Sequence, residues 1–307
     1  MTDADMILLK ADDRCKFATK ARRMPMPSDL PVPAFGRTEI AGHIAATLAR
    51  HCDTLTAAFH APGQIASCYV DDLLPEPIAR AISHQFPGTG DMVLKGSLRE
   101  RKYVSAQMDR HAPLIEEAIY AFQDTRVLRV LKDITGLPEL EPDAALYAGG
   151  ISAMPQGNYL RPHIDNSHDK EQDRYRVMNL LYYVTPDWQP DYGGNLELWD
   201  TGPKGEGRVI HSRFNRLVLM ATNRNSWHSV SEITHPGVRR CVSNYYFSRT
   251  PLDTGDYFHA TSFRGRPEES LTDMLLRLDN AVRTTLLRAF GTRLFKNPHV
   301  YKRTEMP

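Results

Sequence analysis

The sequence lacks the features that mark several classes of protein. No apolar run reaches the length of about 18 residues that a membrane-spanning helix needs, so no membrane span is expected. The first 20 residues mix acidic and basic side chains without the apolar core of a secretion signal, so export is not expected. The 38 basic and 37 acidic residues leave a formal net charge of +1, and no bulk field would attract nucleic acid or an anionic membrane.

Cysteine is also scarce. The four cysteines are Cys15, Cys52, Cys68 and Cys241, and they form neither a CxxC pair nor a regular framework. A chain of 307 residues can bury a core large enough to be stable without disulfides. The pattern therefore predicts reduced thiols and a cytoplasmic protein.

Helical periodicity is present on both sides of a central region. The expected helices run from Thr38 to Phe59, from Pro75 to Phe86, from Pro113, from Asp124 as a cap to just before Gly136, and from Ser270 to Phe290 with a stop at Gly291. The last helix has an apolar stripe, Leu271, Met274, Leu275, Leu278, Val282 and Leu286. We expect this stripe to pack on the core, although arginines on the helix also allow peripheral contact with an acidic lipid surface.

The central region changes to a period of two. Short alternating runs cover 146–152, 159–164, 177–184, 195–199, 217–221 and 241–247, separated by Gly, Asn, Asp and Pro. Many short strands of this kind indicate a mainly β fold with supporting helices, of the sandwich or jelly-roll type. The expected organisation is an N-terminal arm and helix (1–66), a jelly-roll domain (67–250) and a C-terminal helical extension (251–307).

His163 and Asp165 are candidate metal ligands. They are two residues apart in a strand-like stretch, so their side chains leave the same face. His228 is the best candidate for a third ligand arriving from another strand. Two imidazoles and one carboxylate on one side of an octahedron are typical of non-haem iron oxygenases. Taken alone, an HxD pair is more often incidental than functional.

Arg239 begins a strand-like run after His228. Alternation places Arg239, Cys241 and Ser243 on one face, and a guanidinium inside a sheet needs a carboxylate partner because an unpaired buried charge is costly. The distal carboxylate of 2-oxoglutarate would supply that partner, with Ser243 as a further candidate for binding the co-substrate. The alternatives are an internal Asp or Glu partner, or a strand in which Arg240 faces inward.

These residues carry a resemblance to a known family. The stretch from Tyr159 to Phe247 resembles the catalytic core of the iron and 2-oxoglutarate dependent oxygenases of the prolyl 4-hydroxylase type, especially the oxygen-sensing prolyl hydroxylases. The similar segments are 159–166 (YLRPHIDN), 176–184 (RVMNLLYYV), 193–198 (GGNLEL), 214–218 (FNRLV), 227–230 (WHSV) and 239–247 (RRCVSNYYF).

The resemblance implies a double-stranded β-helix with His163, Asp165 and His228 as Fe(II) ligands. It implies that Arg239 and Tyr183 bind the distal carboxylate of 2-oxoglutarate. It further implies consumption of O2, release of succinate and CO2, and hydroxylation of an unactivated C–H bond.

The substrate is less well marked. Trp227, beside a ligand, is a candidate for lining the pocket, and Arg264 and Arg266 follow the core closely enough to recognise an anionic substrate. We expect a small metabolite or biosynthetic intermediate as the substrate. The alternatives are a prolyl or other residue of a protein, and a metal-binding sensor without turnover.

Overall fold

The computed structural model describes residues 35–147, 149–290 and 300–302, with the side chains of the last helix described as far as Thr285. The first 34 residues, where an extended arm is expected, and the helix stop expected at Gly291 lie outside these ranges. Among the residues described, no helix is both long enough and apolar enough to cross a membrane.

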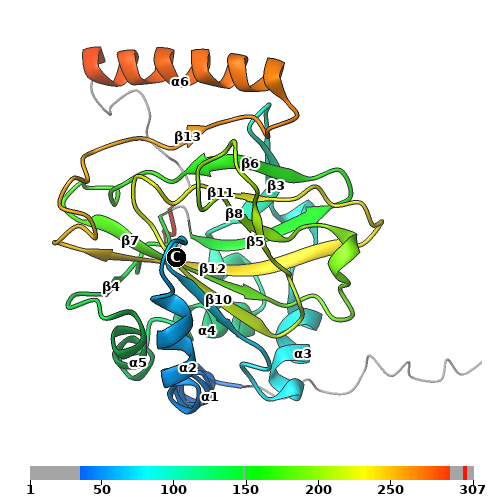
Figure 1. The fold of residues 1–307 in the computed structure, drawn as a ribbon. Helices are drawn as coiled ribbons and strands as arrows, with labels where there is room; N and C mark the ends of the chain where they lie inside the picture. The colour runs from blue at the N-terminus through cyan, green and yellow to red at the C-terminus, as the bar shows by residue number, and fades with distance from the viewer. Residues whose placement is uncertain (1–34, 148, 291–299, 303–307) are drawn as a thin grey trace, which may run out of the picture. The chain divides into compact units, whose positions relative to one another are not determined.

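An antiparallel sheet organises the described part of the chain (Figure 1). Ten strands follow one another in the order β1-β10-β7-β12-β5-β3-β6-β11-β8-β9, while β2, β4 and β13 pair with β3, β12 and β6. The strands are β1 (Ser67–Val70), β2 (Val93–Gly96), β3 (Glu100–Ser105), β4 (Glu141–Pro142), β5 (Gly150–Pro155), β6 (Tyr159–Ile164), β7 (Tyr175–Tyr183), β8 (Leu196–Leu198), β9 (Arg208–Ile210), β10 (Arg216–Ala221), β11 (His228–Val230), β12 (Val238–Ser248) and β13 (Ser262–Phe263). The sheet curls into the half-barrel of a double-stranded β-helix, which confirms the expected jelly roll.

Helices brace this sheet. They are α1 (Arg37–Arg50), α2 (Cys52–Phe59), α3 (Glu76–Gln85), α4 (Pro113–Ala121), α5 (Thr125–Thr135) and α6 (Ser270–Phe290), with short 3₁₀ turns at Thr89–Asp91, Met108–Arg110 and Pro190–Tyr192. Figure 1 shows α1 to α5 on one side of the sheet and α6 on the other, beside β13. On the α1–α5 side, Tyr182 packs against the ring of Phe122 at 5.6 Å, and the hydroxyl of Tyr246 donates to the Phe122 carbonyl at 2.9 Å.

Local sequence signals predicted the limits of α5 correctly, but they missed a break in the helix expected from Thr38 to Phe59. Asp124 caps α5 by accepting from the Arg126 N–H at 2.9 Å, and Gly136 follows the helix at φ +68°, a conformation that glycine adopts without strain. The single helix expected from Thr38 to Phe59 is wrong, because the chain breaks it at His51. The break separates α1, which contacts α4 and α5, from α2, which contacts α5 and β1.

The orientation expected for α6 is also wrong. Its apolar stripe faces solvent, with exposed fractions of 76% for Leu271 and 64% for Leu278. The polar side faces the sheet instead, because Asp273, Asp279 and Asn280 bind groups there. Specific pairing with arginines and backbone therefore decided the orientation, whereas periodicity alone gave only the existence and length of the helix.

Candidate metal centre

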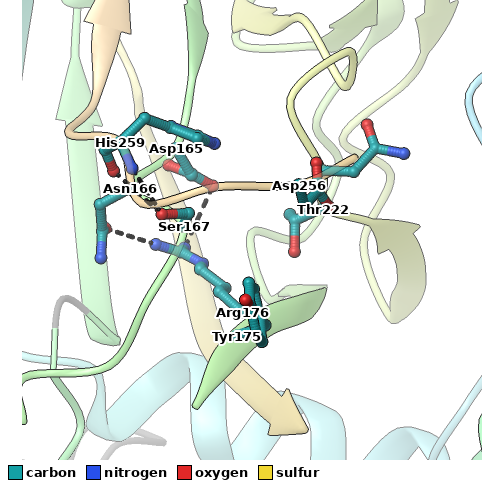
Figure 2. Close-up of a pocket in the computed structure, with 9 residues that line it drawn as sticks. Asp165, Asn166, Ser167, Tyr175, Arg176, Thr222, Asp256 and His259 are labelled. Carbon is teal, nitrogen blue, oxygen red and sulfur yellow. Dashed lines mark hydrogen bonds and ion pairs between the residues drawn. The ribbon is translucent and has the colours of Figure 1, made fainter. Parts of the chain in front are cut away.

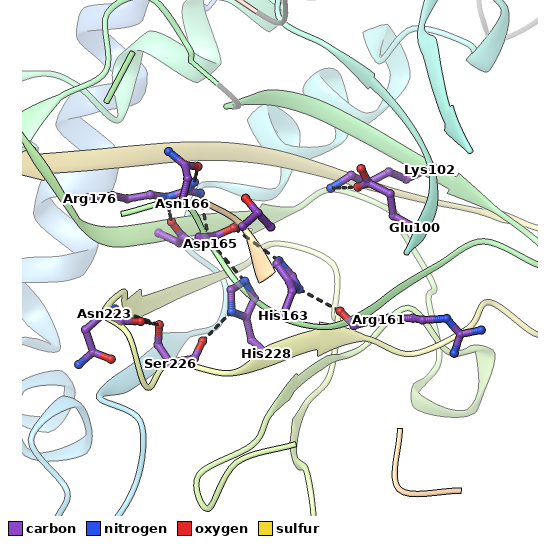
Figure 3. A network of polar contacts seen from close by, with 12 residues as sticks. Glu100, Lys102, Arg161, His163, Asp165, Asn166, Arg176, Asn223, Ser226 and His228 are labelled. Carbon is purple, nitrogen blue, oxygen red and sulfur yellow. Dashed lines mark hydrogen bonds and ion pairs between the residues drawn. The ribbon is translucent and has the colours of Figure 1, made fainter. Parts of the chain in front are cut away.

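The three expected ligands converge at one point (Figure 3). His163 lies on β6, Asp165 follows that strand directly, and His228 begins β11, where it pairs opposite His163. The Nε2 atoms of His163 and His228 each lie 3.5 Å from a carboxylate oxygen of Asp165. One nitrogen or oxygen from each residue lies within 4.8 Å of the others, so a single ion could contact all three side chains.

Backbone carbonyls orient both imidazoles. The Nδ1 atom of His163 lies 2.9 Å from the carbonyl oxygen of Arg161, and that of His228 lies 2.9 Å from the carbonyl oxygen of Ser226. A carbonyl can only accept, so each Nδ1 carries the proton and each Nε2 keeps a free lone pair. This is the tautomer that binds a metal through Nε2.

Asp165 is held by two residues of β7 that the sequence reasoning did not single out. Asn179 Nδ2 donates to Asp165 Oδ2 at 2.7 Å, and Arg176 Nη2 lies 3.1 Å from the same oxygen. The Arg176 guanidinium also donates to Asn179 at 2.9 Å and stacks 3.5 Å from the ring centre of Tyr245. Strict alternation would put Arg176 and Asn179 on opposite faces. A register shift between β7 and β12 turns Arg176 inward.

The charge states suit a metal. Burial alone would raise the pKa of Asp165, but Arg176 and the two imidazoles hold it well below its ordinary value. Burial, together with the neighbouring His163, lowers the pKa of His228 to about 3. The carboxylate is therefore ionised and His228 is neutral at physiological pH, which are the forms that coordinate a divalent cation.

Arg239 faces the interior of the half-barrel, and no carboxylate of the described residues pairs with it. It is 3% exposed, its guanidinium lies 4.6 Å from the ring centre of Tyr183, and its Nη1 lies 3.8 Å from Met154 Sδ. Within the described residues, the Nε of Arg239 and the hydroxyl of Tyr183 are buried and make no hydrogen bond. Burial raises the pKa of Tyr183 to about 12, so its hydroxyl remains a donor. These unsatisfied donors fit the distal carboxylate of 2-oxoglutarate.

The alternative of an inward Arg240 does not match the structure. Arg240 points to the other face, where its Nη1 donates to the Ser83 carbonyl of α3 at 3.3 Å. Ser243 lies on the inward side of β12, half-buried and 3.8 Å from Cys241 Sγ. It is near the expected co-substrate site but contacts neither Arg239 nor Tyr183 in any bond described.

Gly193 and Gly194 lie against Glu232 and Ile233, and Gly194 also lies against Arg239. Their φ angles are +79° and +71°, which side-chain-bearing residues rarely adopt. A Cβ on Gly193 would lie 1.9 Å from the Glu232 carbonyl oxygen, and one on Gly194 would lie 2.4 Å from Ile233 Cδ1 and 3.2 Å from Arg239 Cγ. The glycines therefore allow this segment to pass close to Glu232 and Ile233, and Gly194 leaves room for the Arg239 side chain.

A second, half-buried ion pair lies on β3 and was also missed. Lys102 Nζ lies 3.1 Å from Glu100 Oε2, both on β3 (Figure 3). Burial by itself would lower the pKa of Lys102, but Glu100 raises it above its ordinary value. The four consecutive charged residues from Arg99 to Lys102 hid this strand, because such a run usually faces water.

A pocket opens beside Asp165, with an empty volume of about 250 Å³ that includes its mouth (Figure 2). Its lining consists of Asp165, Asn166, Ser167, Tyr175, Arg176, Thr222, Asn223, Asp256 and His259. The last two belong to the C-terminal extension. The Thr222 hydroxyl is buried and makes no hydrogen bond within the described residues. The sequence offered no local signal for Asp256 or His259.

The residues expected to meet the substrate lie elsewhere. Trp227 is half-buried and does not line this pocket. Arg264 is bound to Asp273 at 2.6 and 2.9 Å, and Arg266 to Glu197 at 3.1 and 2.6 Å. Both guanidinium groups are thus engaged by internal carboxylates. Arg264 binds within the C-terminal extension, and Arg266 attaches the extension to β8.

The fold and the site together define a class of protein. A double-stranded β-helix with two histidines and an aspartate at one point, and a buried arginine without a carboxylate partner, is the arrangement of a non-haem iron dioxygenase that uses 2-oxoglutarate. Comparison with known proteins gives the family. Residues 149–248 match the model of the 2OG-Fe(II) oxygenase superfamily, and this part of the chain belongs to it, with Fe(II) and 2-oxoglutarate as cofactors.

The chain is similar to curated relatives in sequence and to a solved structure in fold. The chain is 31% identical over 96 residues to prolyl 3-hydroxylase OGFOD1 of Mus musculus and 32% identical over 90 residues to the protein of that name in Xenopus laevis. These alignments cover 30% and 28% of this chain but 17% of each relative. A prolyl 4-hydroxylase from Phytophthora capsici has the same fold, with a TM-score of 0.50, 15% identity and coverage of 87% of this chain and 83% of its own.

Proposed function

We propose that this protein hydroxylates a residue of a protein substrate, most simply a proline, in a reaction that consumes 2-oxoglutarate and O2. The observation that carries the reaction class is the convergence of His163, Asp165 and His228, together with a buried Arg239 that pairs with no carboxylate among the described residues. The relatives that share about a third of their residues with this region carry the name prolyl 3-hydroxylase. They favour a protein substrate over the small metabolite that we expected from the sequence.

The residues of the site have different roles in the proposed reaction. His163, Asp165 and His228 would hold Fe(II) on one side and leave positions for the co-substrate and O2. Arg239 and Tyr183 would bind the distal carboxylate of 2-oxoglutarate. Arg176 and Asn179 keep Asp165 ionised and in one orientation. Iron with 2-oxoglutarate and O2 supplies the oxidation of an unactivated C–H bond, with succinate and CO2 as the other products.

The lining of the pocket suits a polypeptide. The lining is mostly polar and uncharged, with amide and hydroxyl groups of Asn166, Ser167, Thr222 and Asn223. Such groups can pair with the backbone of an extended segment while a single ring reaches toward the metal.

The test is mass spectrometry on proline-containing peptides and on small-molecule extracts. Each is incubated with the protein, Fe(II), 2-oxoglutarate and ascorbate, with the His228→Ala variant as the matched control. A gain of one oxygen on a peptide, absent with the variant, supports the proposal. A gain on small molecules alone would replace the protein substrate with a metabolite. Succinate formation equal in the two proteins would remove His228 from the site.

A further inference from the structure

The C-terminal tail adds a strand to the one that carries His163. β13 pairs antiparallel with β6, with Phe263 opposite His163. The next residue, Arg264, donates its N–H to the Pro162 carbonyl at 2.8 Å, and Pro162 has no N–H to donate in return. This bond places Arg264 and Pro162 at the hydrogen-bonding position of the two strands, so Phe263 and His163 form a pair without hydrogen bonds between them. In antiparallel sheets, opposite side chains of a pair without hydrogen bonds come closest.

The Phe263 ring lies flat on the imidazole. The two ring centroids are 5.1 Å apart and the planes differ by 15°. Phe263 is 5% exposed and His163 is 4% exposed, so the contact is made inside the protein. A stacked planar ring restricts rotation of the imidazole out of its plane, which the carbonyl at Nδ1 alone does not do.

The side chain of Asn280, on α6, holds Phe263 in place through two hydrogen bonds to the Phe263 backbone. Asn280 Oδ1 accepts from the Phe263 N–H at 3.2 Å, and Asn280 Nδ2 donates to the Phe263 carbonyl at 2.6 Å. These are the two groups that point away from β6, so Asn280 takes the place of a further strand. Both backbone groups of Phe263 are thereby satisfied, and β13 is held between β6 and α6.

The attachment of α6 does not depend on Asn280. Four ion pairs tie the tail to itself and to the sheet, namely Arg264–Asp273, Arg266–Glu197, Arg161–Glu269 and Arg99–Asp279. Loss of Asn280 would thus loosen Phe263 while α6 stays in place. This separates the contact with the ligand from the stability of the tail.

We propose that Phe263 is a positioning residue of the metal centre, which sets the plane of the His163 ring and is itself locked by Asn280. The inference rests on His163 binding the metal, as proposed above. Arg161 fixes the tautomer through its carbonyl, and Phe263 fixes the ring plane. Changes in the groups that orient a metal ligand typically cost about 10- to 100-fold in metal affinity.

Filling the apolar core is the simpler role for Phe263, and it predicts different behaviour. Phe263 also belongs to a cluster with Met154, Leu160, Trp188, Val230, Ile233 and Leu276. If it only fills space, leucine should replace it at little cost to the metal site. If the flat stack matters, tyrosine should preserve metal binding and leucine should not.

The test is anaerobic titration of the metal-free full chain with Co(II), followed by calorimetry and by the d–d absorption bands. We expect Phe263→Leu to weaken Co(II) binding about 10- to 100-fold and to shift the bands. Phe263→Tyr should bind like the unmodified protein, and Asn280→Ala should shift the bands in the same direction as Phe263→Leu. Leu276→Ala, the control from the same cluster, should lower the melting temperature but keep the affinity and the spectrum.

Several results would overturn the inference. One such result is unchanged affinity and bands in Phe263→Leu. Another is a loss of affinity in Leu276→Ala as large as that in Phe263→Leu, which would reveal a general packing effect. If Phe263→Leu does not fold, Asn280→Ala decides, and unchanged bands in that variant refute the proposal. Failure of the proposed function looks different, because His163→Ala would then bind Co(II) as well as the unmodified protein does.

Discussion

Replacing Arg239 with alanine should weaken 2-oxoglutarate binding far more than replacing Arg240. The two residues are adjacent on β12 but point to opposite faces. Arg239 is 3% exposed and has donors without partners, whereas Arg240 donates to the Ser83 carbonyl on the helical side. Arg239→Ala would therefore leave the distal carboxylate of the co-substrate buried without a counter-charge. Arg240→Ala would lower the stability of the fold and leave co-substrate binding nearly unchanged.

The size of the effect follows from the kind of contact. A charge-assisted bidentate pair in a site this dry contributes roughly 2–4 kcal/mol, which is about a 30- to 700-fold change in affinity. The 2-oxoglutarate affinity of Arg239→Lys should lie between those of Arg239→Ala and the unmodified protein, because an ammonium group keeps the charge but not the planar pair of donors. Arg240→Ala should change the affinity by less than about threefold.

The assay is calorimetric titration of 2-oxoglutarate into anaerobic protein loaded with Mn(II) in place of Fe(II). A matched control is 2-oxobutyrate, which chelates the metal in the same way but lacks the distal carboxylate. Its weak binding should be the same in Arg239→Ala and in the unmodified protein. Equal losses of 2-oxoglutarate binding in the Arg239 and Arg240 variants, or equal losses for both ligands, would refute the assignment.

Three further predictions concern single side chains. Tyr183→Phe should weaken 2-oxoglutarate binding by about 1 kcal/mol in the same titration, since one neutral donor is lost, and no change would place the carboxylate elsewhere. Asp165→Gly should abolish hydroxylation measured by succinate release while some metal and 2-oxoglutarate binding survives, and an unchanged rate would remove Asp165 from the metal. Burial raises the pKa of Asp143 to about 7, so its contribution to stability is present below pH 4 and is lost as the pH rises toward 7. Asp143→Asn should therefore stabilise the protein by about 1–3 kcal/mol more at pH 8 than at pH 5 in thermal unfolding, and an equal effect at both pH values would contradict a raised pKa.

The sequence was most informative where local pattern and chemistry coincide. The strand expected at 159–164 is β6 to the residue, and its HxD pair lies where alternation placed it. Arg239 could be assigned to the interior because a cation in an alternating strand must face either a partner or water. The helix expected from Ser270 also begins at the predicted residue. These features depend on a few neighbouring residues.

The missed features depend on contacts between distant segments. Arg176 reaches Asp165 only because of the register shift between β7 and β12, which no pattern within β7 reveals. β3 has Glu100 and Lys102 turned inward, where they neutralise each other, so its pattern mimics an exposed strand. β13 has two residues, too few for any periodicity, although one of them stacks on a metal ligand.

The functional unit extends beyond the segment that matches the family. That match covers residues 149–248, and all six residues expected to hold iron and 2-oxoglutarate lie inside it. The tail nevertheless supplies Asp256 and His259 to the wall of the pocket beside Asp165, and Phe263 to the face of His163. The segment from Asp256 to Phe263 therefore contacts both the pocket beside Asp165 and a ligand of the metal. A change in this segment would alter the pocket wall and the surroundings of His163 together, although the segment lies outside the residues that match the family.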